Sequence, residues 1–81
     1  MHEYHAVEEV VKQINTKAQE SGALKIDSVT LVIGEQLGFA EESVRLYFES
    51  IAEGGLFNET KLIIKSEPGT KFYIDNIEIE N

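Results

Sequence analysis

The chain has 81 residues, of which 42% are hydrophobic, and a formal net charge of −8. This composition supports one small folded domain and excludes a disordered tail. The acidic balance disfavours nucleic acid and anionic membranes as partners, and the lack of cysteine excludes disulfides, thiol nucleophiles and thiolate zinc sites.

The first predicted element is an amphipathic helix from about residue 3 to 21. Apolar residues recur at steps of three and four between Ala6 and Ala18, with charged and polar residues opposite them. Gly22 follows Ser21 at the place where a left-handed helix cap is expected. Helix and cap together predict a well-defined first element.

A strand and a second helix follow. Lys25 to Gly34 is rich in β-branched residues and alternates in polarity, which predicts a strand. The two glycines that bracket residues 34–38 predict a turn. A buried stripe then predicts a helix from about Ala40 to Glu53, with acidic residues at its positive end and Gly54-Gly55 after it.

The remaining chain predicts two strands joined by a tight turn. One strand contains residues 62–64 and the other residues 72–74, and Pro68-Gly69 is typical of a type II turn. We therefore expect a hairpin. The apolar phase slips between Ile74 and Ile77, which predicts a bulge near Asp75 and Asn76.

These elements predict an α+β fold in the order α-β-α-β-β, with two helices on one face of a three-stranded mixed sheet. The helical crossover makes the first two strands parallel, and the tight turn makes the last two antiparallel. The other face, which bears Val32, Ile63 and Tyr73, has no element to cover it. That face either stands in water or packs against another chain.

The first three residues, Met1-His2-Glu3, form a candidate metal chelate. The terminal amine and the His2 amide close a five-membered ring around an ion, and the His2 amide and Nδ1 close a six-membered ring. Planar nitrogen ligation suits Ni(II) or Cu(II), whereas Zn(II) prefers a tetrahedron. The amides of residues 2 and 3 precede any intrahelical acceptor, so their ionisation breaks no helical hydrogen bond.

Nearby side chains could favour metal binding by this chelate, through their charge or as an additional ligand. Glu3, Glu8 and Glu9 offset the positive end of the helix, and His5 is a candidate axial ligand. Any chain with histidine at position two has the same atoms, so a solvated terminus with a surface His5 is the alternative. No catalytic constellation is recognisable, and we expect a protein that is not an enzyme.

The Met1-His2-Glu3 start, the strand that runs into Gly34-Glu35-Gln36-Leu37-Gly38, the second helix and the two last strands resemble the HypA/HybF family of nickel-insertion accessory proteins for NiFe hydrogenase. The resemblance covers nearly the whole chain. It implies a metallochaperone that binds Ni(II) through His2 and neighbouring N-terminal nitrogens, with Glu3 close by. It further implies delivery to the hydrogenase large subunit, and in some members to urease, with a GTPase partner.

The largest departure of the chain from this family lies between the last two strands. Family members carry a zinc-binding module with two Cys-x-x-Cys pairs between the last two strands, whereas Pro68-Gly69-Thr70 stands there in this chain. Tyr4 and His5 also differ from the residues expected of the family. We therefore expect a single nickel-binding domain over residues 1–81 that binds Ni(II) and no zinc. It is either a natural relative without the zinc module or an engineered deletion that isolates the nickel domain.

Two further expectations concern the setting of the protein. No apolar run is long enough to cross a membrane and no signal or transit peptide is recognisable, so we expect a cytoplasmic protein. A second reading of the function stays open. In that reading the chain is a metal-free interaction module, derived from the same family, that forms a homodimer or docks a partner through its uncovered sheet face.

Overall fold

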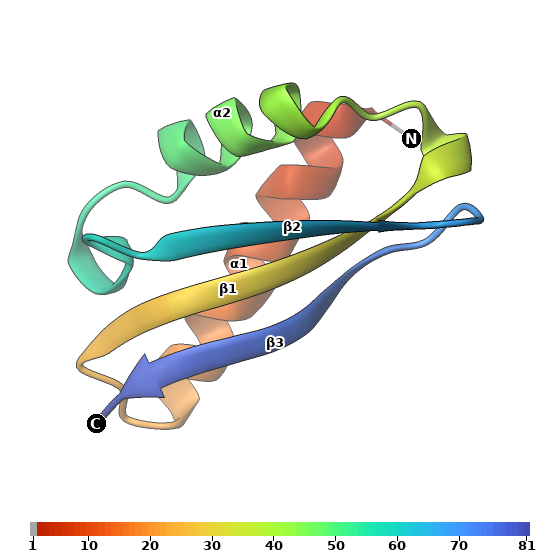
Figure 1. The fold of residues 1–81 in the computed structure, drawn as a ribbon. Helices are drawn as coiled ribbons and strands as arrows, with labels where there is room; N and C mark the ends of the chain where they lie inside the picture. Colours follow the sequence, from red (N-terminus) through yellow and green to blue (C-terminus); the bar gives the residue numbers. More distant parts are fainter. Residues whose placement is uncertain (1) are drawn as a thin grey trace.

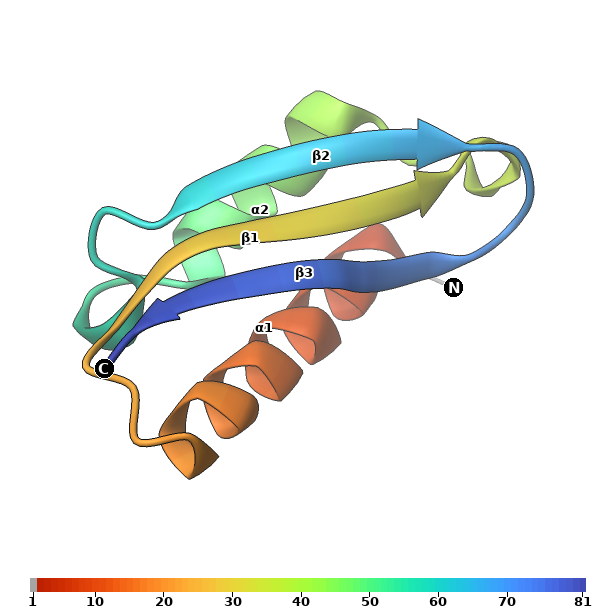
Figure 2. The same cartoon turned by 60° about the horizontal axis from the view of Figure 1, so that its bottom comes forward.

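Residues 2–81 are the part of the chain that the computed structural model describes, and they form two helices and three strands. Both helices lie on one face of the sheet (Figures 1 and 2), which confirms the predicted α+β fold and its element order. The elements are α1 (Glu3–Glu20), β1 (Lys25–Gly34), the 3-10 turn η1 (Glu35–Leu37), α2 (Glu41–Ile51), the 3-10 turn η2 (Gly55–Phe57), β2 (Lys61–Glu67) and β3 (Phe72–Glu80).

β1 is the central strand, and the sheet order is β2-β1-β3 (Figure 2). β1 pairs in parallel with β2, as the helical crossover predicts, and antiparallel with β3. β2 and β3 are therefore not hydrogen-bonded neighbours, and the predicted hairpin is wrong. A type II turn splays the strands that it joins, and a strand that is buried along nearly its whole length, like β1, is stabilised by a neighbour on each edge.

Residues 68–71 cross the end of β1 and connect its two neighbours. The backbone amide of Gly34, the last residue of β1, donates to the carbonyl of Lys71 at 2.6 Å. A Cβ on Gly34 would lie 2.5 Å from the carbonyl oxygen of Gly69 and 2.8 Å from the amide nitrogen of Lys71. Because these are backbone atoms, they cannot move aside as a flexible side chain can. The crossing therefore requires glycine at position 34.

The antiparallel pairing of β1 with β3 is irregular at two places. Asp75 is an extra residue in β3, because its neighbours Ile74 and Asn76 oppose consecutive residues of β1. This confirms the bulge predicted from the slip in apolar phase. A second irregularity lies at Asp27 of β1, where the apolar pattern gives no comparable signal.

α1 closes with the glycine cap that the sequence predicts. Gly22 has a φ of 68°, and its amide donates to the carbonyl of Gln19 at 3.1 Å. The amide of Ala23 donates to the carbonyl of Ala18 at 3.0 Å, so two of the last carbonyls of the helix are satisfied. α2 is slightly shorter than the predicted range 40–53, because it begins one residue later and ends two residues earlier.

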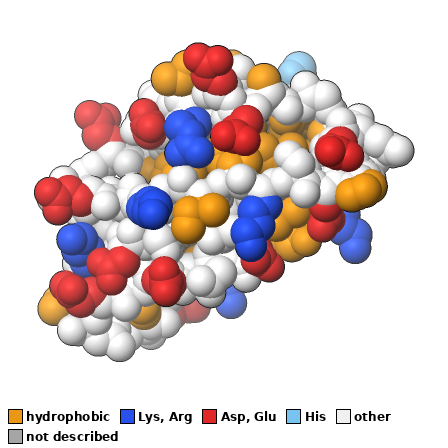
Figure 3. Space-filling model, viewed as in Figure 1, with side chains coloured by type: hydrophobic (Ala, Val, Ile, Leu, Met, Phe, Trp, Pro, Cys, Tyr) orange, Lys and Arg blue, Asp and Glu red, His pale blue; other side chains and the backbone are white. Residues whose placement is uncertain are grey.

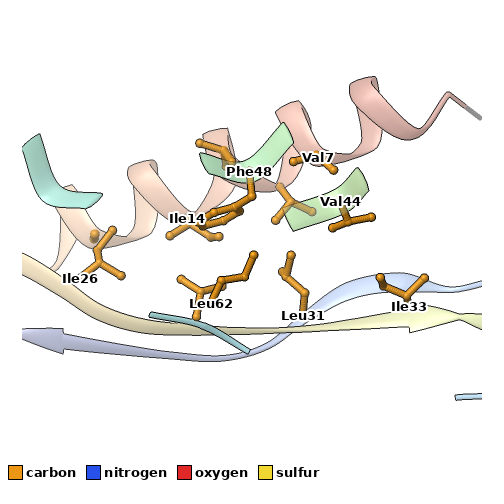
Figure 4. Close-up of a cluster of buried hydrophobic side chains, with 12 residues drawn as sticks. Val7, Ile14, Ile26, Leu31, Ile33, Val44, Phe48 and Leu62 are labelled. Atoms are coloured by element: carbon orange, nitrogen blue, oxygen red, sulfur yellow. The ribbon is translucent and has the colours of Figure 1, made fainter. Parts of the chain in front are cut away.

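The core lies between the two helices and the sheet (Figure 4). Ile14 of α1 and Leu31 of β1 are fully buried, and Phe48 of α2 is 3% exposed. These side chains point toward one another from the three elements, so the apolar stripes predicted for both helices face the sheet. The other buried apolar residues of this cluster are Val7, Val10, Val11, Ala18, Ile26, Val29, Ile33, Val44 and Leu62.

The sheet face without helices carries Val32, Ile63 and Tyr73. Val32 is buried at 5% exposure, Ile63 is half-buried, and Tyr73 is 37% exposed. The hydroxyl of Tyr73 donates to Oε1 of Glu67 at 2.9 Å. On the side of the molecule seen in Figure 3, basic and acidic side chains lie among the apolar ones. Charged side chains therefore interrupt the apolar surface on this side of the molecule.

Candidate metal centre

α1 begins at the residues in which the sequence predicts a chelate. His2 is its N-cap, with an extended backbone (φ −80°, ψ 134°), and the carbonyl of His2 accepts the amide of Ala6 at 3.0 Å. The amides of residues 2 and 3 thus stand ahead of the hydrogen-bonded turns of the helix. Met1, whose amine belongs to the predicted chelate, lies outside the described residues.

The two imidazoles lie beside each other on the surface. The ring centroids of His2 and His5 are 5.7 Å apart, the ring planes meet at 82°, and both residues are exposed. Histidine surface is visible at the upper right edge of Figure 3. A spacing of three residues places both side chains on one side of α1. Accessible imidazole nitrogens suit nickel, copper or zinc, so these residue types fit a metal ion.

Glu3 is half-buried, and its carboxylate is engaged by the protein itself. Oε2 of Glu3 accepts a hydrogen bond from the backbone amide of Ala40 at 3.0 Å. Ala40 is the N-cap of α2, and the starts of the two helices lie close together (Figure 1). Nothing in the sequence indicates this contact, because no periodicity or motif links residues that are 37 positions apart.

An aromatic pair lies next to the histidines. The rings of Tyr4 and Tyr47 meet edge to face, with centroids 5.3 Å apart and planes at 82°. The ring of Tyr4 also lies 6.2 Å from that of His5. The helical stripe assigns Tyr47 to the core, and its ring does pack against the core, yet it also holds Tyr4 at the surface. Its contact with Tyr4 has no signal in the sequence.

Glu8 and Glu9, the other acidic residues near the predicted chelate, do not form a metal site with the two histidines. Glu8 and Glu9 are exposed on α1, and Glu9 lines an open groove of about 580 Å³ between α1 and β3. Within residues 2–81, no three histidine or carboxylate side chains converge where one ion could be held. An ion at His2 and His5 would therefore also need backbone nitrogens or the terminal amine, as the chelate prediction requires.

The rest of residues 2–81 offers no comparable cluster. No buried side-chain nitrogen or oxygen in this part of the chain lacks a hydrogen-bond partner, so none points to a missing ligand.

Among the described helices, none has the length and apolar character needed to span a membrane.

Two solved structures share this fold. The solution structure of the Ni metallochaperone HypA from Helicobacter pylori superposes with a TM-score of 0.71, covering 98% of this chain and 86% of that chain at 22% sequence identity. A second solution structure of a HypA protein gives a TM-score of 0.68 at 21% identity. At these identities the likeness shows the fold alone.

Curated sequences are more similar. The hydrogenase maturation factor HypA of Dehalococcoides mccartyi is 38% identical over 68 residues, which cover 84% of this chain and 57% of that protein. The HypA of Picosynechococcus sp. is 36% identical over 70 residues, with 86% and 62% covered. This chain spans little more than half the length of these relatives.

Residues 1–76 match the HypA family, which is described as hydrogenase/urease nickel incorporation, metallochaperone. This description is that of a maturation factor and not of an enzyme, in agreement with the expectation from the sequence. On the strength of this match, which spans nearly the whole chain, the chain belongs to the HypA family.

Proposed function

We propose that this chain is a nickel metallochaperone that binds Ni(II) at its first residues and releases it during the maturation of hydrogenase, and of urease where that enzyme is present. The observation that carries the proposal is the position of His2. It caps α1 with an extended backbone and presents an exposed imidazole beside that of His5. Membership of the HypA family supports nickel as the ion.

The proposed ligands are nitrogens of the first residues. The amine of Met1, the backbone nitrogens of His2 and Glu3 and the imidazole of His2 surround the ion, and His5 supplies an axial nitrogen. Nitrogen ligands in a plane favour Ni(II) or Cu(II) over ions that prefer oxygen. Because the imidazoles are exposed, a recipient site can exchange ligands with them and take the ion.

The partners and the domain organisation follow from the same proposal. The proposed partners, both implied by the family resemblance, are the hydrogenase large subunit, which receives the ion, and the maturation GTPase. Residues 1–81 form a single nickel-binding domain in which the turn at 68–70 stands in place of a zinc module, so no zinc is bound. We also propose a cytoplasmic location, where such maturation takes place.

The alternative function, a metal-free module that dimerises or docks through the uncovered sheet face, has less support. The apolar residues on that face are few, and Val32 is already buried at 5% exposure. Polar groups there are satisfied within the chain, since Ser28 donates to Glu78 at 2.6 Å and Tyr73 donates to Glu67 at 2.9 Å. Such a face gives a partner little apolar area to bury.

The test is calorimetric titration of Ni(II) into the tag-free protein at neutral pH. We expect stoichiometric binding that is lost in His2→Ala and in a variant with two residues added before Met1, because both changes remove an in-plane nitrogen. Glu53→Gln, a change of one acidic surface residue outside the candidate site, is the matched control for weak attraction to the acidic surface and should bind like the parent. Equal affinity in all four proteins would overturn the proposal.

A further inference from the structure

One carboxylate joins the starts of the two helices. Ala40 is the N-cap of α2, and no side chain caps that helix from within its own segment, because alanine has no acceptor atom. Oε2 of Glu3 accepts the backbone amide of Ala40 at 3.0 Å. Glu3 also lies in the first turn of α1. A single negative charge therefore stands at the positive ends of two helices, where it is stabilising for both.

A second contact holds the same turn. Tyr4, the next residue, meets the ring of Tyr47 of α2 at 5.3 Å between centroids. Successive residues of a helix point about 100° apart, so Glu3 and Tyr4 together turn one side of α1 toward α2. His2 and His5, three residues apart, share the other side and are exposed.

From these contacts we propose that Glu3 is a positioning residue whose carboxylate, held by the Ala40 amide, fixes the first turn of α1 so that His2 and His5 face solvent together. This inference rests on the proposed nickel function. In this arrangement Glu3 contributes its backbone nitrogen to the ion, while its side chain acts on α2. The carboxylate thereby holds the residues that would close the chelate rings and reduces the freedom lost on binding.

The test compares Glu3→Gln with Glu3→Ala. The glutamine amide keeps an oxygen acceptor for the Ala40 amide, whereas alanine removes it. In the metal-free proteins, we expect the NMR resonance of the Ala40 amide to stay near its parent position in Glu3→Gln and to shift in Glu3→Ala. We expect Ni(II) affinity to fall about tenfold in Glu3→Ala, since ordering a loosened residue costs on that scale, and less than about threefold in Glu3→Gln.

Two further measurements distinguish a positioning role of Glu3 from a role as a metal ligand or in overall stability. The absorption spectrum of bound Ni(II) should be the same in both variants and the parent, because the ligands are unchanged. Thr60→Val, which removes the hydrogen bond from Thr60 to the carbonyl of Ile26 (2.7 Å), is a destabilised control and should keep the parent affinity.

Several outcomes would overturn the inference. One is an affinity loss in Glu3→Gln as large as in Glu3→Ala, which would make the carboxylate charge or its ligation the important property. Others are an unchanged Ala40 resonance in Glu3→Ala and an affinity loss in Thr60→Val equal to that in Glu3→Ala. Failure of the parent protein to bind Ni(II) would overturn the proposed function instead, while the Ala40 resonance would still show whether the contact exists.

Discussion

The amide of Gly34 donates to the carbonyl of Lys71 at 2.6 Å, and this bond fixes the crossing of residues 68–71 over the end of β1. The same crossing brings the backbone of Gly69 so close that a side chain on Gly34 has no room. The sheet order therefore depends on one residue without a Cβ, because the connection between the two outer strands passes directly over it.

Gly34→Ala should destabilise the fold by about 3 kcal/mol, because the added Cβ overlaps backbone atoms that cannot rotate away. Urea unfolding followed by circular dichroism measures this change. Ser66→Ala, at an exposed position near the end of β2, is the control and should change stability by less than about 0.5 kcal/mol. Equal stability of the two variants would show that the crossing is looser than described.

Glu67→Gln should lower the pKa of Tyr73 toward the ordinary value for tyrosine. The hydrogen bond to Glu67 is the main cause that raises the pKa of the Tyr73 hydroxyl, followed by desolvation and by the charges of Glu67 and Asp75. Titration of the tyrosinate absorbance at alkaline pH measures it, with Glu53→Gln as a control that leaves the titration unchanged.

The raised pKa of Tyr73 also sets the sign of a stability change. The folded protein holds the phenol proton more tightly than the unfolded chain does. This contribution is therefore fully present below the unfolded value of about 10 and is lost as the pH rises through the folded value. The stability of the parent should fall more steeply than that of Glu67→Gln in this alkaline window, and parallel curves would contradict the assignment.

Ile14→Ala should cost about 2 to 5 kcal/mol, because Ile14 is fully buried between α1, α2 and the sheet. Ile14→Val, which removes only one methyl group, should cost about 0.5 to 1.5 kcal/mol. Urea unfolding of both variants gives the two values. A loss in Ile14→Ala no larger than in Ile14→Val would mean that the surrounding side chains collapse into the space.

His5→Ala should weaken Ni(II) binding by about threefold, equivalent to ~0.7 kcal/mol, whereas His2→Ala should abolish it. The difference is expected because His5 is proposed as an axial ligand and His2 as a ligand in the plane. Titration calorimetry of both variants provides the comparison, with Glu20→Gln at the far end of α1 as a control for surface charge. Complete loss in His5→Ala would move His5 into the plane.

Local signals in the sequence predicted the elements well. The apolar repeat of α1 and its Gly22 cap, with φ 68°, are properties of neighbouring residues, so a single sequence contains them. The bulge at Asp75 is also local, because an extra residue shifts the alternation within one strand.

Longer-range relationships were not predictable in the same way. Pro68-Gly69 is a turn signal, but whether the flanking strands pair with each other or with a third strand depends on β1, which lies far away in the sequence. The contact between Glu3 and Ala40 is a similar case, because neither a glutamate at position 3 nor an alanine at position 40 predicts a hydrogen bond between them. The candidate site residues could be recognised in the sequence, whereas the contacts that hold the start of α1 against α2 are visible only in the structure.

The central place of β1 also has a consequence for the order in which the protein is made. β1 leaves the ribosome early, but its antiparallel partner β3 follows roughly 40 residues later, an interval of about 2 to 8 s at ordinary rates of synthesis. During this interval one edge of the apolar run Val29–Ile33 has no partner, and such an edge is prone to pair with other chains. The central strand of the finished protein is thus a segment with an open edge while the chain is being synthesised.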